Sequence, residues 1–167
     1  LNTLSVAPTP GGTNVVTFAI NNIGSATNLQ TTLEGLDTLA IEGADGIADV
    51  FTVRNPVGAP VVSVLAGGIT IVDTGGPGPG RLFLNTLGGD DRVLVDVSAN
   101  DVVAVPITFD GGAGRDLLTV SGTPATAVDE VIYTPGADVT AGRLAYENVA
   151  NARLMTIDFV NLEPAID

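Results

Sequence analysis

Short runs of alternating apolar and polar residues follow one another along most of the chain. The clearest runs are Val15–Ile20, Val50–Val53, Ile69–Val72, Arg81–Leu84, Val93–Val97, Val105–Phe109 and Val131–Tyr133. Alternation with a period of two is typical of half-buried β-strands, and Gly-rich or Asp-rich turns separate these runs. Ala141–Leu154 is the only stretch with helical character, and Gly142 and Asn151 weaken it. The pattern therefore predicts an all-β chain.

A five-residue pattern recurs five times. It consists of an Asp or Asn, a spacer, an apolar residue, a second spacer and a second apolar residue, and its copies begin at Asn14, Asp49, Asp91, Asp116 and Asp129. We interpret each copy as a turn residue that enters a strand whose alternate side chains point inward. A further strand and a Gly-containing turn precede three of the copies. The predicted unit is therefore a strand, a Gly/Asp corner and a second strand.

The spacing of these copies favours a stacked architecture. Asp49 and Asp91 are 42 residues apart, and Asp91 and Asp116 are 25 apart, which is about two rungs and one rung of a parallel β-helix. We expect a parallel β-helix or solenoid-like repeat domain, with a β-sandwich as the alternative because it also has short strands and frequent turns. Residues 161–167 resemble residues 35–42, which indicates one unit of a longer tandem array or of a head-to-tail fibre.

Composition agrees with this pattern. Val, Thr and Ile are the residues favoured in strands, and they make up 22, 19 and 10 of the 167 residues. A chain of this length is expected to form one domain, here residues 1–167. Residues 55–72 carry no charge, but they contain two Pro and three Gly, so they fit strands and turns better than a membrane-spanning helix. We expect no membrane span.

Charge and missing residue types restrict the functions that the chain can have. It has 19 acidic residues against six Arg, no Lys, no His and no Cys, and a formal net charge of −13. Nucleic acid and anionic lipid are repelled by such a surface, whereas divalent cations are attracted to it. The absence of His, Cys and Lys excludes Ser-His-Asp and Cys-His triads, the usual zinc ligands and Schiff-base chemistry.

One segment matches a known calcium-binding pattern. Residues 111–119 read Gly-Gly-Ala-Gly-Arg-Asp-Leu-Leu-Thr and satisfy every fixed position of the nonapeptide G-G-x-G-x-D-x-U-x. The chain here resembles the haemolysin-type (RTX-like) calcium-binding repeats of large secreted bacterial proteins. Residues 88–95 and 42–51 are degenerate copies. These copies lie 25 and 42 residues apart, whereas the copies of the family are stacked every nine residues.

The resemblance implies a set of Ca²⁺ ligands. They are Asp116 with main-chain carbonyls near Gly112 and Gly114, followed by Asp91 and Asp49 in the weaker copies. Asp110, Asp90 and Asp45 lie beside these residues and are candidates to complete a site, the alternative for them being solvated surface charge. For the motif Asp residues the alternative is a turn cap, in which the carboxylate accepts backbone N–H groups at the corner.

The sequence favours a structural role over an enzymatic one. The six Arg are scattered and form no recognisable cluster with carboxylates, so a polysaccharide-lyase-like enzyme is the least favoured of the functions considered. We expect a calcium-stabilised structural or adhesive building block of an extracellular or cell-surface bacterial assembly such as a stalk, matrix or fibre. Its expected partners are further copies or neighbouring repeats, joined head to tail. The alternative is a module that binds a surface glycan or another protein.

Overall fold

The computed structural model describes residues 3–6, 13–20, 28–35, 37–55, 62–66, 69–73, 78–98, 100–150 and 152–163. In these ranges the chain forms fourteen β-strands and no α-helix, which confirms the all-β prediction. Ala141–Leu154 contains a strand and the start of another instead of a helix. The same ranges contain no helix long and apolar enough to cross a membrane. Residue 36 and residues 164–167, which belong to the two similar segments compared above, lie outside the described residues.

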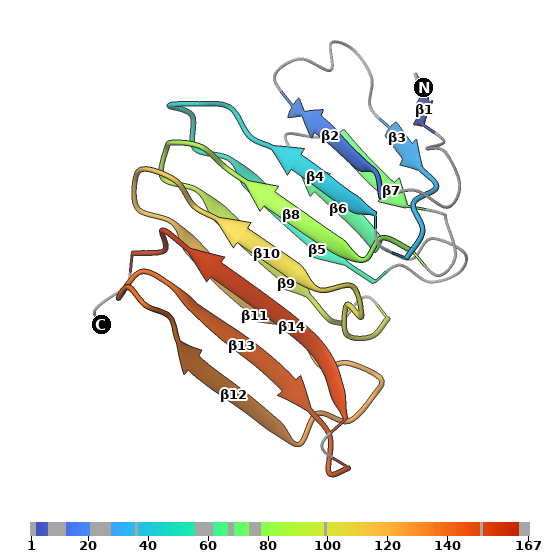
Figure 1. Ribbon diagram of the computed structural model, residues 1–167, viewed down its shortest axis with the longest axis vertical. Coiled ribbons are helices and arrows are strands. Elements are labelled where there is room, and N and C mark those ends of the chain that lie inside the picture. Colours follow the sequence, from blue (N-terminus) through green and yellow to red (C-terminus); the bar gives the residue numbers. More distant parts are fainter. Residues whose placement is uncertain are drawn as a thin grey trace.

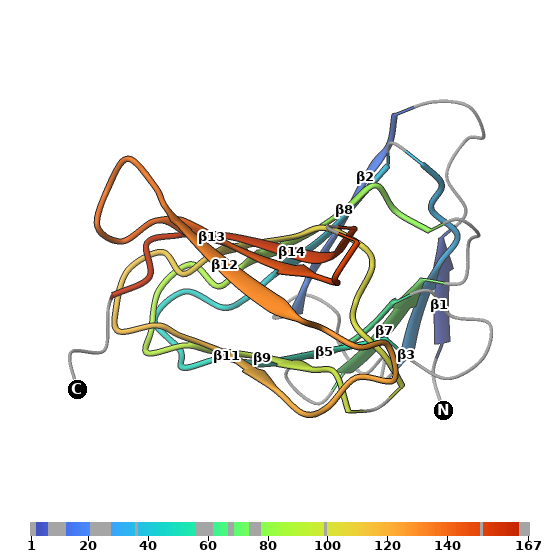
Figure 2. The same cartoon turned by 90° about the horizontal axis from the view of Figure 1, so that it is seen from below.

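The strands form two seven-stranded sheets, which lie one above the other in Figure 2. Sheet A contains, in spatial order, β1 (Thr3–Val6), β3 (Asn28–Thr31), β7 (Ile69–Asp73), β6 (Val62–Ala66), β5 (Val50–Arg54), β9 (Arg92–Asp96) and β11 (Leu117–Ser121). Sheet B contains β12 (Glu130–Pro135), β13 (Gly142–Glu147), β14 (Arg153–Val160), β10 (Ile107–Asp110), β8 (Arg81–Asn85), β4 (Thr38–Glu42) and β2 (Val15–Ala19).

Three strand–corner–strand units stack side by side at the centre of the molecule. They are β4–β5, β8–β9 and β10–β11, and Figure 1 shows their strands following one another along the long axis. In sheet B, Leu82 pairs in parallel with Leu39 and Ile107. In sheet A, Val93 pairs in parallel with Phe51 and Leu118. The register therefore places equivalent residues of the three repeats next to each other. The first two repeats are 43 residues apart in sheet B and 42 in sheet A, and the last two are 25 apart in both sheets.

The core lies between the two sheets and consists of the inward-facing residue at every second strand position. Leu39, Leu82 and Ile107 from sheet B and Phe51 and Val95 from sheet A are all fully buried. Each large apolar side chain buried in this way contributes about 1.5–3 kcal/mol to folding through the hydrophobic effect. The alternation read from the sequence thus identifies the residues that join the sheets.

The sheets are mixed, and this limits how far the solenoid prediction is met. Strand β6 runs antiparallel to both β5 and β7, and β13 runs antiparallel to both β12 and β14. The parallel stacking agrees with the solenoid prediction, whereas two mixed sheets packed face to face are also compatible with the β-sandwich alternative. Of the five predicted motif copies, the three that begin at Asp49, Asp91 and Asp116 stack together. The copies at Asn14 and Asp129 lead into β2 and β12, the two opposite edges of sheet B.

Candidate functional site

The eight residues proposed above as calcium ligands all lie along one edge of the molecule. This corner edge is made by corner 1 (residues 43–49), corner 2 (residues 86–91) and corner 3 (residues 111–116), together with Asp110 at the end of β10. In Figure 1 the three turns that follow β4, β8 and β10 lie next to one another on the left. They come together because the parallel strands of sheet B end at the same edge.

A column of buried aspartates runs through the corners. Asp49, Asp91 and Asp116, the last residues of the three corners, are 6%, 0% and 4% exposed. The backbone N–H of Asp49 donates to Oδ1 of Asp91 at 2.7 Å, and the N–H of Asp91 donates to Oδ1 of Asp116 at 2.9 Å. Each of these two carboxylates therefore satisfies the backbone of the preceding unit, which is the turn-capping role considered above, extended from one unit to the next.

Within the described part of the chain, two carboxylate oxygens of this Asp column have no hydrogen-bond donor. In corner 1, Oδ2 of Asp49 accepts the N–H of Ala44 at 2.7 Å. The buried Oδ2 atoms of Asp91 and Asp116 accept no hydrogen bond from any residue that the structure describes. Because a buried polar atom without a partner costs about 1–3 kcal/mol, these two oxygens are the atoms of this edge that would gain most from binding a cation or a proton.

The residue at the end of each sheet B strand explains this difference between the corners. The N–H groups equivalent to that of Ala44 belong to Leu87 and Gly112, because each is the second residue after its strand. The N–H of Leu87 donates to Oδ1 of Asn85 at 3.3 Å, and the N–H of Gly112 donates to Oδ1 of Asp110 at 3.1 Å. The short Asn and Asp side chains make this local bond readily. The N–H groups of Leu87 and Gly112 therefore do not donate to the carboxylates of Asp91 and Asp116.

Burial makes two members of the Asp column weaker acids than usual. Burial raises the pKa of Asp49, the Ala44 N–H opposes this change, and the negative charge of Asp91 adds to it. Burial also raises the pKa of Asp116, with the Asp91 N–H opposing the increase and the charges of Asp91, Glu163 and Asp90 adding to it. The ionised forms of Asp49 and Asp116 are therefore unfavourable in the folded state, and a cation or proton bound there would relieve the repulsion.

The corner glycines allow the three corners to stack closely. Gly112 and Gly114 have positive φ values of 78° and 137°. A Cβ atom on Gly112 would lie 1.8 Å from the Leu87 carbonyl oxygen, and one on Gly114 would lie 1.7 Å from the Gly89 carbonyl oxygen. Between them, the Ala113 N–H donates to the Leu87 carbonyl at 2.8 Å, and the Gly89 N–H donates to the Ala113 carbonyl at 2.9 Å. The glycines of the nonapeptide thus leave the space that corner 3 needs to pack against corner 2.

The remaining candidates lie on the outside of the same edge. Oδ1 of Asp90 accepts the N–H of Arg115 at 3.1 Å and so also links corners 2 and 3. Asp45 lies against corner 2, because a Cβ atom on Gly88 would be 2.9 Å from its Oδ1. Among the described residues, no group of three or more acidic side chains is arranged to hold a metal ion. A calcium ion at this edge would therefore need main-chain carbonyl and water oxygens as well.

Some residues of this edge were not identified from the sequence. Thr86 occupies the position of Gly43 and Gly111 in corner 2, is fully buried, and donates its Oγ1–H to the Gly111 carbonyl at 3.0 Å. Asn161 follows β14 and donates its Nδ2–H to Oδ1 of Asp110 at 2.8 Å. The position of Thr86 directly after a strand is a signal that aligning the three units would have revealed. The contact of Asn161 has no local signal, because it depends on β14 pairing with β10.

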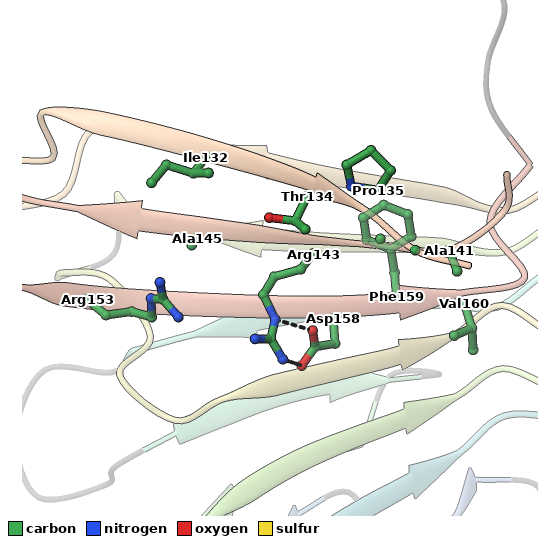
Figure 3. A pocket seen from close by; sticks show the side chains of 12 residues that line it. Ile132, Thr134, Pro135, Ala141, Arg143, Ala145, Arg153, Asp158, Phe159 and Val160 are labelled. Atoms are coloured by element: carbon green, nitrogen blue, oxygen red, sulfur yellow. Dashed lines mark hydrogen bonds and ion pairs between the residues drawn. The ribbon is translucent and has the colours of Figure 1, made fainter. Parts of the chain in front are cut away.

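A second concave surface lies on the C-terminal part of sheet B. This open pocket has a volume of about 420 Å³. Figure 3 shows its lining side chains, which include Ile132, Thr134, Arg143, Asp158 and Phe159. Arg143 donates from Nε and a terminal nitrogen to the two carboxylate oxygens of Asp158, at 2.6 and 3.0 Å. This paired fork, with an aromatic ring nearby, offers hydrogen bonds and apolar contact to a polar ligand.

Replacing a corner glycine should destabilise the fold according to the space that the new methyl group would meet. For Gly114→Ala we expect a loss of about 3 kcal/mol or more, because left-handed strain is combined with a carbonyl clash. The matched control is Gly46→Ala in corner 1, where φ is also positive at 73° but no atom lies within 4 Å. The control should cost only about 1–2 kcal/mol. Urea unfolding of both variants measures the difference, and equal losses would contradict the close stacking of corners 2 and 3.

Asp116 should make the fold more stable at low pH. Its pKa in the folded protein is raised above its ordinary value of 3.8, so the folded state binds the proton more tightly than the unfolded chain does. Its contribution to stability is therefore fully present below 3.8 and falls as the pH rises through the raised value. Urea unfolding in chelator should show the wild type gaining stability relative to Asp116→Asn between pH 7 and about pH 4. A relative loss would show that the folded state favours the carboxylate.

Comparison of this chain with protein-family models, with curated proteins and with solved structures finds no match in any of the three.

Proposed function

We propose that this chain is a structural building block of an extracellular or cell-surface assembly, such as a stalk, a matrix or a fibre. The observation that carries the proposal is the stacking of three strand–corner–strand units, in register in both sheets and linked by the Asp column. Units of this kind bury a continuous core only against neighbouring units, so the architecture extends by repetition. We infer a solenoid-like geometry for this central part on the same grounds.

The charged side chains support a structural role more than a catalytic one. Arg54, Arg143 and Arg153 form ion pairs with Asp96, Asp158 and Glu147, respectively. Each pair joins two strands within one sheet or two positions of one hairpin, where it fixes register. The role that we propose is therefore mechanical, without an enzymatic step.

We further propose that calcium stabilises the corner edge. The unpartnered Oδ2 atoms of Asp91 and Asp116 supply two buried anionic oxygens of the hard type that Ca²⁺ prefers. Carbonyl groups of the corner glycines, including Gly112 and Gly114, would supply further ligands, as the resemblance to RTX-like repeats implies. Calcium would then neutralise carboxylates whose mutual repulsion otherwise opposes folding. An acidic module with weak calcium sites suits an extracellular setting, where such sites have affinities of about 0.1–1 mM.

Calcium should raise the melting temperature of the wild-type chain. A site with a Kd of about 0.1 mM would stabilise the fold by about 1.4 kcal/mol at about 1 mM calcium. This corresponds to an increase in Tm of roughly 3–6 °C for a chain of this size. The measurement is thermal unfolding by circular dichroism in calcium, in magnesium and in chelator, all at the same moderately high ionic strength, which screens nonspecific effects.

Two variants separate binding at the Asp column from general charge screening. Asp116→Asn should lose the calcium-dependent increase in Tm while it keeps an acceptor for the Asp91 N–H. Glu130→Gln is the matched control, because it also removes one negative charge but lies at the exposed start of β12, at the opposite edge. It should keep the full increase. Identical melts of the wild type in calcium and in chelator would reject calcium stabilisation and leave the Asp column as a set of turn caps.

A second candidate function is binding of a surface glycan by a single module. The open pocket of Figure 3 favours it, because the Arg143–Asp158 fork brings charge-assisted hydrogen bonds to a concave surface that Ile132 and Thr134 also line. Saturable binding of monomeric protein on a glycan array, abolished by Arg143→Ala, would favour this function over the structural role.

A further inference from the structure

We propose that the two ends of the molecule are complementary, and that the β1–β2 end of a second copy docks onto the β11–β12 end, continuing both sheets. The inference rests on the proposed structural role and deepens it by naming the surfaces that join the copies. Strand β11 would pair with β1 of the next copy, and β12 would pair with β2.

The β11–β12 end lacks a layer. Sheet A stops at β11, whereas sheet B continues beyond β10 with β14, β13 and β12. Val131 and Tyr133 of β12 pair with Tyr146 and Leu144, whose neighbours on β14 are the buried Met155 and Ile157, so they share the inner face of sheet B. They are nevertheless 52% and 54% exposed, whereas inner residues of the central strands are fully buried. Their exposure marks the place where sheet A is missing.

An apolar pocket lies where sheet A ends at β11 and sheet B continues. It has a volume of about 200 Å³, and its lining includes Val97, Val120, Val128 and Tyr146. Val120 lies on β11, the last strand of sheet A, and Tyr146 lies on β13 of the overhanging part of sheet B. An additional strand beside β11 would lie beneath this overhang and cover the apolar side chains.

At the opposite end, sheet A extends further than sheet B. Beyond the β4–β5 unit, the described strands of sheet A are β6, β7, β3 and β1, whereas the described part of sheet B continues with β2. Figure 1 shows β1 and β2 at the end of the long axis opposite to β12. Sheet A is therefore the longer sheet at this end and sheet B at the other. When two copies are placed end to end along this axis, the protruding part of sheet A of one copy fills the place that sheet A leaves empty at the β11–β12 end of the other.

Strand direction permits both junctions at once. Within sheet A every strand runs in the same direction except β6, so β1 and β11 are parallel to each other. Within sheet B every strand runs in the same direction except β13, so β2 and β12 are also parallel. A copy related by translation and twist along the axis would thus form a parallel pair in each sheet, as the central strands do.

Strand number permits the arrangement to repeat. Within the residues that the structure describes, each sheet has seven strands, so both sheets advance by the same distance with each added copy. With a strand spacing of about 4.8 Å, seven strands give an axial repeat of about 34 Å. Unequal sheets would lose register after one junction, whereas equal sheets can continue without limit.

The charge distribution favours contact at these edges. The first charged residue of the chain is Glu34, so β1 and β2 carry no charge in a protein with a net charge of −13. Strand β11 is also uncharged, and Leu117 on it is 41% exposed. Proteins usually protect open edges with charged residues, and the residues of β1, β2 and β11 themselves include none. The acidic copies therefore meet where mutual repulsion is weakest.

The test uses two double variants that each block one end. Leu117→Lys with Thr119→Lys places two charges on β11, and Val15→Lys with Thr17→Lys places two on β2. All four positions are exposed, so the fold should persist, as checked by circular dichroism. The matched control is Val139→Lys with Val149→Lys, two exposed valines in turns, 88% and 86% accessible. Sedimentation velocity over a concentration series measures assembly, and electron microscopy measures the axial repeat.

We expect the wild type and the control to form linear particles with a repeat of about 34 Å, and each edge variant alone to be monomeric. An equimolar mixture of the two edge variants should stop at a dimer, because it contains one intact junction. Edge variants that still polymerise, or a mixture that stays monomeric, would overturn the end-to-end docking while leaving the building-block role in place. A wild type that stays monomeric at every concentration, with and without calcium, would overturn both proposals.

Discussion

The Asp column is the interaction on which the rest of the structure depends. A corner turns the chain sharply from one sheet to the other and leaves the N–H of its last residue inside the molecule. The carboxylate of the next unit accepts that N–H, as Asp91 does for Asp49 and Asp116 does for Asp91. Because each acceptor comes from a different unit, the corners must stack in one register. The glycines are required for the same reason, since any side chain at Gly112 or Gly114 would strike the neighbouring corner.

The same arrangement has an energetic cost. Stacked carboxylates are close enough to repel one another, and two of them keep an oxygen without a donor. The fold is stable only if packing between the sheets exceeds this cost or if a bound cation reduces it. The apolar residues adjacent to the column, such as Phe51 and Phe109, are fully buried and provide that packing. Corner chemistry and core packing are therefore coupled in every unit.

Much of the fold could be predicted from the sequence because the strands have a period of two and the corners use a small set of residues. Between Val50 and Phe109 the alternation predicts every strand except β6, and the spacing of Asp49, Asp91 and Asp116 predicts that their units stack. The antiparallel strand β6 was not predicted, because nothing in residues 62–66 distinguishes an antiparallel neighbour from a parallel one. The unpartnered oxygens were also missed, since they result from competition by Asn85 and Asp110, which becomes visible only with coordinates.

Amide hydrogen exchange measured by NMR tests the Asp column most directly. The amides of Asp49 and Asp91 lie in turns, where exchange is ordinarily fast, yet their acceptors are buried carboxylates of neighbouring units. We predict that both amides exchange as slowly as those of the central strands β8 and β9. Exchange as fast as in the exposed turn at Val139 would contradict the column and, with it, the stacking of the three corners.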